Sequence, residues 1–146
     1  MIIYIGADHA GFRLKEYLKK YLKTKKIKYE DIGTYTDRKK VDFPDFAAKV
    51  AKKVSKNKNS RGILICGTGT GMVMVANRIK GIRAALAYDK YSAVMSRRDN
   101  DANVLCLRGR KTNFRKEKNI VNSWLKSKFS NIDRYKRRIK KIAKIK

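Results

Sequence analysis

Short apolar segments alternate along this chain with longer segments whose apolar residues recur at helical spacing. The segments expected to form strands are residues 2–6, 27–32, 61–66, 82–87 and 103–107. Those expected to form helices are residues 11–24, 45–57, a stretch from the glycine loop to about 79, 90–98, 114–128 and about 133–144. An alternation of strands and helices without a linker predicts a parallel sheet covered by helices on both faces.

We therefore expect residues 1–146 to form a single Rossmann-like three-layer α/β domain with a five-stranded parallel sheet. Its basic C-terminal helix, at about 133–146, is part of that domain. In such folds the ligand lies beyond the carboxyl ends of the strands, near the point where the strand order reverses. Residues 6–9 follow the first strand and residues 66–71 follow the third, so both are expected there. Residues 99–101 precede the fifth strand and are less obviously at the same edge.

The composition suits one compact domain, since 42% of the 146 residues are hydrophobic. The two cysteines, Cys66 and Cys106, lie at the ends of apolar runs and form no spaced disulfide framework or zinc cluster, so we expect no metal. The first strand begins at once, without a signal peptide, and no apolar run approaches the about 18 residues of a membrane span. These features favour a cytoplasmic protein without a membrane partner.

The charge is strongly basic, with 39 Lys and Arg residues against 12 Asp and Glu residues and a formal net charge of +27. Such an excess is typical of nucleic-acid binding. It also fits a biased composition, with lysines such as Lys15, Lys19, Lys20 and Lys23 at exposed helical positions. Small phosphorylated substrates fit a basic protein equally well.

Gly67, Gly69 and Gly71 follow the third strand at every second position. A loop of this kind can turn its amides toward a ligand, and the helix that follows adds its positive end. Both favour an anion, either a phosphate or a developing enolate. The dinucleotide and P-loop fingerprints do not fit, and a tight strand-to-helix turn explains the glycines as well.

Cys66 stands at the end of the third strand, directly before these glycines. Surrounding amides favour a thiolate, which beside an anion hole can remove a proton from a carbon next to a carbonyl. A small buried apolar residue is the alternative, and Cys106 fits that description. His9 is the only histidine, and its place at a strand end makes it a candidate ligand, although a loop histidine without function is also possible.

Motifs along nearly the whole chain resemble those of the ribose/galactose isomerase family, which contains the type B ribose-5-phosphate isomerases and the galactose-6-phosphate isomerase subunits. The motifs are GADHAGF (6–12), DIGTY (31–35), VDFPDFA (41–47), GILICGTGTGM (62–72), ANRIKGIRAAL (76–86), YSAVMSRRDNDANVLCLRGR (91–110) and DRYKRRI (133–139). The resemblance implies a homodimer or tetramer whose active sites are shared between subunits. It also implies that no metal or nucleotide cofactor takes part.

The implied reaction is aldose–ketose interconversion of a phosphorylated sugar through an enediolate, with ribose 5-phosphate and ribulose 5-phosphate as the pair. Cys66 would be the base that moves the proton between C1 and C2, and Thr68 would assist it. A second branch of the family uses a glutamate just after the glycine loop, where this chain has Met72. The loop amides from Gly67 to Gly71, including those of Gly69 and Thr70, would stabilise the enediolate oxygen.

The resemblance also assigns the groups that hold the substrate. Asp8 and Asn100 resemble ligands of the sugar hydroxyls. The phosphate would be bound by His9, Arg110, Arg134 and Arg138, some of them reaching across the subunit boundary. Arg134 and Arg138 are four residues apart, so both can project from one helix face toward one phosphate. Among so many lysines, they also fit a solvated basic face.

Asp99 departs from the family pattern, because the ribose isomerases usually have a histidine there that is thought to open the furanose ring. Asp99 is therefore the third candidate catalytic residue. The departure leaves allose 6-phosphate and galactose 6-phosphate open as substrates. A basic nucleic-acid-binding module without activity is the alternative of a different class, but Cys66, the glycine loop and Asn100 argue against it, so we expect no nucleic-acid partner.

Overall fold

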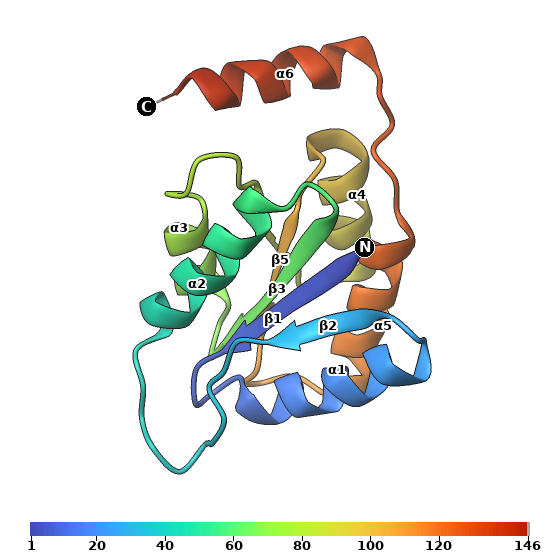
Figure 1. Ribbon diagram of the computed structural model, residues 1–146. Helices are drawn as coiled ribbons and strands as arrows, with labels where there is room; N and C mark the ends of the chain where they lie inside the picture. Colours follow the sequence, from blue (N-terminus) through green and yellow to red (C-terminus); the bar gives the residue numbers. More distant parts are fainter. Residues whose placement is uncertain (146) are drawn as a thin grey trace.

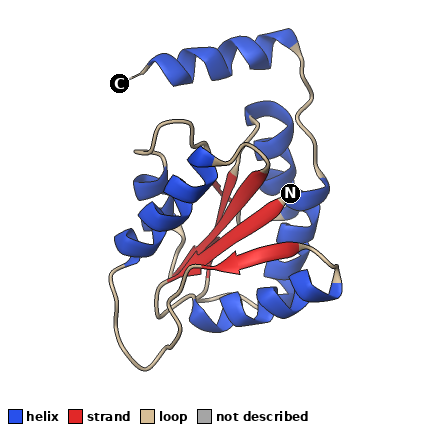
Figure 2. Cartoon of the chain, in the orientation of Figure 1, coloured by secondary structure: helices blue, strands red, loops and turns tan. Residues whose placement is uncertain are grey.

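The computed structural model describes residues 1–145 and forms a layered α/β structure (Figures 1 and 2). Its strands are β1 (Ile2–Ala7), β2 (Lys28–Asp31), β3 (Ser60–Cys66), β4 (Ala84–Leu86) and β5 (Val104–Arg108). Its helices are α1 (Phe12–Thr24), α2 (Phe43–Lys56), α3 (Thr70–Ala76), α4 (Lys90–Asn100), α5 (Phe114–Lys126) and α6 (Asp133–Lys144). The predicted five-stranded parallel sheet is confirmed: all strand pairs are parallel, in the order β2-β1-β3-β5-β4.

The central strand β3 shows why the helices form two layers. Successive side chains of a strand point to opposite faces of the sheet. Ile63 and Ile65 pack in a core with residues of α1 and α5, whereas Leu64 and Cys66 pack in a second core with α2 and α3. Because both faces are covered, the strand is apolar without interruption.

Several predicted elements end earlier in the structure than their sequence patterns suggest, β2 and α2 by one residue each. The helix after the glycine loop ends at Ala76 rather than about 79, and α5 ends at Lys126 rather than 128. The fourth strand covers Ala84–Leu86 rather than 82–87, since it pairs with β5 alone at the edge of the sheet. These are differences at element ends, where a hydrophobic pattern carries the least information.

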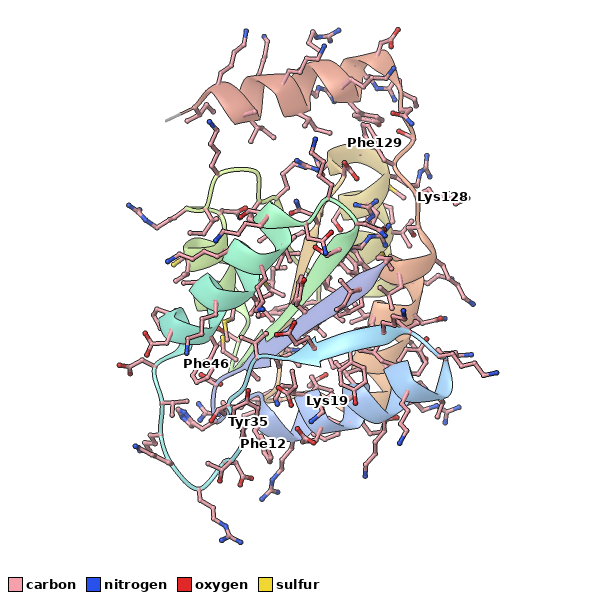
Figure 3. The ribbon with its side chains drawn as sticks, viewed as in Figure 1. Phe12, Lys19, Tyr35, Phe46, Lys128 and Phe129 are labelled. Atoms are coloured by element: carbon pink, nitrogen blue, oxygen red, sulfur yellow. The ribbon has the colours of Figure 1, made fainter. Side chains whose placement is uncertain are left out.

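The expectation that Lys15 is an exposed lysine is wrong. Its side chain is fully buried, and its ammonium contacts the Asp31 carboxylate at 2.5 Å. Lys19, in the middle of α1, also reaches Asp31, at 2.7 Å; Figure 3 labels it together with Phe12 and Tyr35. The ion pairs join α1 to the last residue of β2. A charged side chain at this depth is stable because the opposite charge is buried with it.

Helix α6 lies apart from both layers, across the top of Figure 1, and none of its residues is buried. A linker that carries Lys128 and Phe129 leads to it from α5 (Figure 3). Ser130 fastens this linker to α4, since its N–H and its hydroxyl both donate to the Arg98 carbonyl, at 3.0 and 2.8 Å. Within residues 1–145, the helices are too short or too polar to cross a membrane.

Candidate active site

The strand order reverses between β1 and β3, because the chain continues from β1 to β2 on one side and reaches β3 on the other. Asp8 directly follows β1, and Cys66 is the last residue of β3. The two loops are joined by a hydrogen bond from the Asp8 N–H to the Ile65 carbonyl, 3.1 Å long. Residues 6–9 and 66–71 therefore both lie at the carboxyl edge beside this switch point, as predicted.

The Cys66 thiol is almost enclosed, with 5% of the residue exposed. The Gly69 N–H donates to its Sγ at 3.1 Å, and this hydrogen bond holds the sulfur in place at the end of β3. Gly69 has a φ of +82°, and a Cβ there would lie 2.6 Å from Leu86 Cδ1 and 2.9 Å from the Leu107 carbonyl oxygen. A glycine is thus required to turn this amide back onto the sulfur.

The glycine loop is held from the outside by its neighbours. The Arg110 N–H donates to the Gly67 carbonyl at 3.2 Å, and the Tyr88 hydroxyl donates to the Thr68 carbonyl at 2.9 Å. The Thr68 hydroxyl oxygen accepts the Thr70 N–H at 3.3 Å, which leaves the hydroxyl proton to donate elsewhere. The loop is therefore fastened through its carbonyls, and its amides are left for other partners.

Three amides of this loop are available for an anion. Within residues 1–145, the N–H groups of Gly67, Thr68 and Gly71 donate to no protein acceptor. The Thr70 amide is already bonded to Thr68, and the Gly69 amide to Cys66. Of the loop amides expected to form an anion hole, one is thus bonded to the thiol, and three are left for a ligand. The sequence does not reveal which amides belong to each group.

Asp8 and His9 lie on the first loop of this edge. One carboxyl oxygen of Asp8, Oδ1, accepts the N–H groups of Ala10 and Gly11 at 2.9 and 3.1 Å. Nδ1 of His9 accepts the Val41 N–H at 3.2 Å. In the neutral imidazole this bond assigns the proton to Nε2, which can then donate to a ligand.

Arg110 completes the carboxyl-edge group. Its side chain is exposed and lies over the glycine loop, because a Cβ at Gly67 would come within 3.4 Å of its Cδ and Nη1. A fixed positive charge therefore stands beside the open amides. Around this edge the structure gathers Asp8, His9, Cys66, Gly67, Thr68, Gly69, Thr70, Gly71 and Arg110.

The other four candidate residues lie at the opposite end of the sheet. Asp99 and Asn100 form the end of α4, just before β5 begins at the amino edge. Arg134 and Arg138 lie on α6, a helix that contacts α4. Within one chain the two groups are separate, because parallel strands separate the end of α4 from Cys66 by the length of the sheet. The sequence places residues 99–101 less obviously at the carboxyl edge, and the family resemblance implies sites shared between subunits.

Within this second group, the two arginines do share one helix face. Their guanidinium groups lie over the Tyr135 ring, at 4.7 Å for Arg134 and 5.7 Å for Arg138. A hydrogen bond to the Tyr135 hydroxyl raises the pKa of Arg134, and the nearby charge of Asp99 acts in the same direction. The end of α4 and one face of α6 thus form a second group of candidate residues.

Tyr88 and Arg108 are functional candidates that the sequence patterns did not reveal. Arg108 is paired in register with Cys66, and its guanidinium lies 4.6 Å from the centre of the Tyr88 ring. Behind them, burial raises the pKa of Glu117, whose Oε1 accepts the Thr112 hydroxyl. Tyr88 follows the fourth predicted strand, so its position at the carboxyl edge was the available signal.

Cys106 lies in the same apolar core as Cys66 but differs from it chemically. It is fully buried, and burial together with the neighbouring Cys66 charge raises its pKa far above the usual range. It therefore stays a neutral thiol, and the packing role expected of it is consistent with this environment. Among residues 1–145, no three His, Cys, Asp or Glu side chains form a group that could hold a metal ion.

A buried thiol held by an amide thus lies beside loop amides and an arginine, at the switch point of a parallel α/β sheet. The chain belongs to the ribose/galactose isomerase family, whose sequence model matches residues 3–142. The resemblance seen in the motifs is thereby confirmed.

Individual relatives cover almost the whole chain. A probable ribose-5-phosphate isomerase B of Mycoplasma genitalium is 43% identical over 141 residues, which are 96% of this chain and 92% of the relative. A solved ribose 5-phosphate isomerase of Thermotoga maritima has a TM-score of 0.94 at 44% identity and covers 99% of this chain and 98% of its own. The solved ribose-5-phosphate isomerase B of Mycoplasma genitalium with bound ribulose-5-phosphate has a TM-score of 0.93 at 43% identity, with coverages of 97% and 93%.

Proposed function

We propose that this chain interconverts ribose 5-phosphate and ribulose 5-phosphate, with Cys66 as the base that moves a proton between C1 and C2. The observation that carries the proposal is the Gly69 amide bonded to Sγ of Cys66, in a chain closely similar to isomerases of this substrate pair. In such a reaction one base takes the proton from one carbon and returns it to the next. The intermediate is an enediolate, which requires stabilisation of a negative oxygen.

The loop meets that requirement with fixed donors. The amides of Gly67, Thr68 and Gly71 are free to bond the developing oxyanion, and they need no rearrangement, because the loop carbonyls are already fastened by Arg110 and Tyr88. The Thr68 hydroxyl can donate to the same oxygen. Asp8, anchored through Oδ1, has its other carboxyl oxygen available for a sugar hydroxyl.

The phosphate binds at the outer end of this edge. His9 offers Nε2, and Arg110 stands over the glycine loop. We assign Arg134 and Arg138 to the same phosphate, supplied by a second copy of the chain, together with Asn100 as a hydroxyl ligand. Two half-sites at opposite ends of one chain fit a two-fold dimer, in which each end of one subunit meets the other end of its partner.

The homodimer also explains α6. Tyr135 and Ile139 on this helix are only partly covered, and Ile142 is 48% exposed, although all three lie on one side. An amphipathic helix without a partner on its own chain indicates a surface that another subunit covers. The proposed enzyme uses no metal or nucleotide cofactor, acts in the cytoplasm, and takes allose or galactose 6-phosphate more poorly than ribose 5-phosphate.

The test is a paired cysteine substitution. Exchange of the substrate proton at C2 for deuterium, followed by NMR in heavy water, reports the proton-transfer step directly. Cys66→Ala is expected to lower kcat by about 10²–10⁴-fold, the usual effect of losing a positioned base. Cys106→Ala, the matched control in the same core, should keep its turnover and lose about 1 kcal/mol of stability. Near-normal exchange by the Cys66→Ala chain would refute the assignment.

A further inference from the structure

A cavity of about 510 Å³ opens at the amino edge of the sheet, away from the carboxyl edge that carries Cys66. Its lining is strongly basic and includes Lys58, Arg61, Arg83 and Arg97. Asp101 is the only acidic residue among the described residues that line it. The cavity therefore has an excess of positive charge that the protein itself does not balance.

Contacts with Asp101 draw two of these arginines together. Nη2 of Arg83 lies 2.9 Å from one carboxyl oxygen of Asp101, and Nη1 of Arg97 lies 2.8 Å from the other. Arg61 lies near enough for both charges to act on it: burial, followed by repulsion from Arg97, lowers its pKa to about 10, and the Asp101 charge acts in the opposite direction. Two guanidinium groups thus contact a single carboxylate, and a third lines the same cavity.

The arginines are held rigidly by backbone carbonyls. Nη1 of Arg61 donates to the Trp124 and Leu125 carbonyls at 3.5 and 3.2 Å, and its guanidinium lies 5.3 Å from the Trp124 ring. Arg97, only 7% exposed, donates to the Ala102 carbonyl at 2.7 Å. A guanidinium fixed in this way loses little freedom when a ligand binds.

Each arginine nevertheless keeps donors without a partner. Among residues 1–145, Nη2 of Arg97, Nη1 of Arg83 and Nη2 of Arg61 make no protein hydrogen bond. None of the three is a completely buried orphan atom either. All three residues line the cavity, so these unpaired N–H groups belong to side chains of its wall.

We propose that this cavity binds a compact phosphate-bearing anion, at a site distinct from the proposed substrate site. Planar guanidinium groups match phosphate oxygens, and a dianion offsets the repulsion between Arg61 and Arg97. The volume is sufficient for a small phosphorylated metabolite as well as for inorganic phosphate.

The site is connected to the end of α4. Nε of Arg83 donates to the carbonyls of Asn100 and Asp101, both at 3.0 Å. An anion that engages Arg83 therefore contacts the residue that holds the Asn100 segment. Binding of an anion in the cavity and the placement of Asn100 therefore both depend on the Arg83 side chain.

Calorimetric titration at constant ionic strength tests the site, with inorganic phosphate in one arm and glycerol phosphate in the other. The protein is the Arg134→Ala/Arg138→Ala chain, which lacks two of the three arginines proposed to bind the substrate phosphate. We expect saturable binding of one anion per chain. Tighter binding of the ester identifies a phosphorylated metabolite as the ligand, and tighter binding of phosphate identifies the free ion.

Three further substitutions in this background locate the anion. Arg83→Gln should weaken binding about tenfold, as loss of a charge-assisted contact does. Lys58 is exposed, so Lys58→Gln should leave the fold intact and weaken anion binding about threefold. Lys56→Gln removes an equal charge outside the cavity and should leave anion binding unchanged. Absence of saturable binding, or equal effects of Lys56→Gln and Lys58→Gln, would overturn the proposal in favour of diffuse attraction to a chain of charge +27.

Discussion

Mixing two inactive variants tests whether an active site is built from two chains. One variant, Cys66→Ala, damages the half-site at the carboxyl edge. The other, Arg134→Ala/Arg138→Ala, damages the half-site on α6, and loss of a charge-assisted phosphate contact costs about ten- to a hundredfold in kcat/KM. Because these positions lie at opposite ends of the sheet, a mixed dimer contains one site with both defects and one site with none.

The expected recovery follows from random pairing. In an equal mixture half of the dimers are mixed, and each has one intact site of two, so the activity should reach about a quarter of that of the wild type. The two proteins are unfolded together, refolded, and assayed for ribulose 5-phosphate formation beside each parent alone. A mixture of Cys66→Ala with Cys66→Ser is the control, since both defects lie in the same half-site and no recovery is expected. If the first mixture is no more active than its parents, each chain builds its own site and the dimer argument is wrong.

Three other predictions concern single groups. Tyr88→Phe removes the hydroxyl that holds the Thr68 carbonyl and should lower kcat about two- to tenfold with KM unchanged, whereas Tyr91→Phe, at a 73% exposed position, should have no effect in the same assay. Asp99→Asn should reduce turnover of ribose 5-phosphate less than Cys66→Ala does. Ribose 5-phosphate should also be the better substrate, and a higher kcat/KM for a hexose 6-phosphate would contradict our substrate assignment. Burial opposes ionisation of Asp31, but hydrogen bonds from lysines outweigh this effect and hold the pKa of Asp31 below 3.8. Its ion pairs therefore stabilise the fold above about pH 4. This stabilisation is lost as the pH falls through the lowered pKa. Denaturant unfolding should show a steep loss of stability in this acid range, and a weaker one for Asp31→Asn.

The order of strands and helices was readable from the sequence because each element has a simple hydrophobic period. Ile63, Leu64 and Ile65 are apolar on both faces of a buried strand, and the spacing in α5 places Ile120, Val121 and Trp124 on one side. The strand order is set by tertiary contacts and was not predicted. The position of the glycine loop beside the loop after β1 was nevertheless expected, because any parallel sheet of this type brings strand ends together at its switch point.

Side-chain partners were much less accessible to sequence reasoning. Lys15 occupies a place in α1 that resembles its exposed neighbours, and only the fold brings Asp31 within reach of it. Tyr88 lies outside the quoted motifs, and Arg108 lies within one (91–110) but was not singled out there. Their relation to the glycine loop depends on the packing of β4 against β5. Local pattern predicts which face of an element is apolar, but a specific polar contact between distant segments depends on the whole arrangement.

The isolated position of α6 has a consequence for the enzyme in dilute solution. A helix of 12 residues that buries nothing on its own chain is only marginally stable in water. In the proposed dimer the free energy that keeps it folded comes from the neighbouring subunit, so separation of the subunits would unravel α6 while the sheet stays intact. Specific activity would then rise with protein concentration and level off once the subunits are associated. An activity assay would therefore detect dissociation of the subunits at concentrations where spectroscopy shows no unfolding of the sheet.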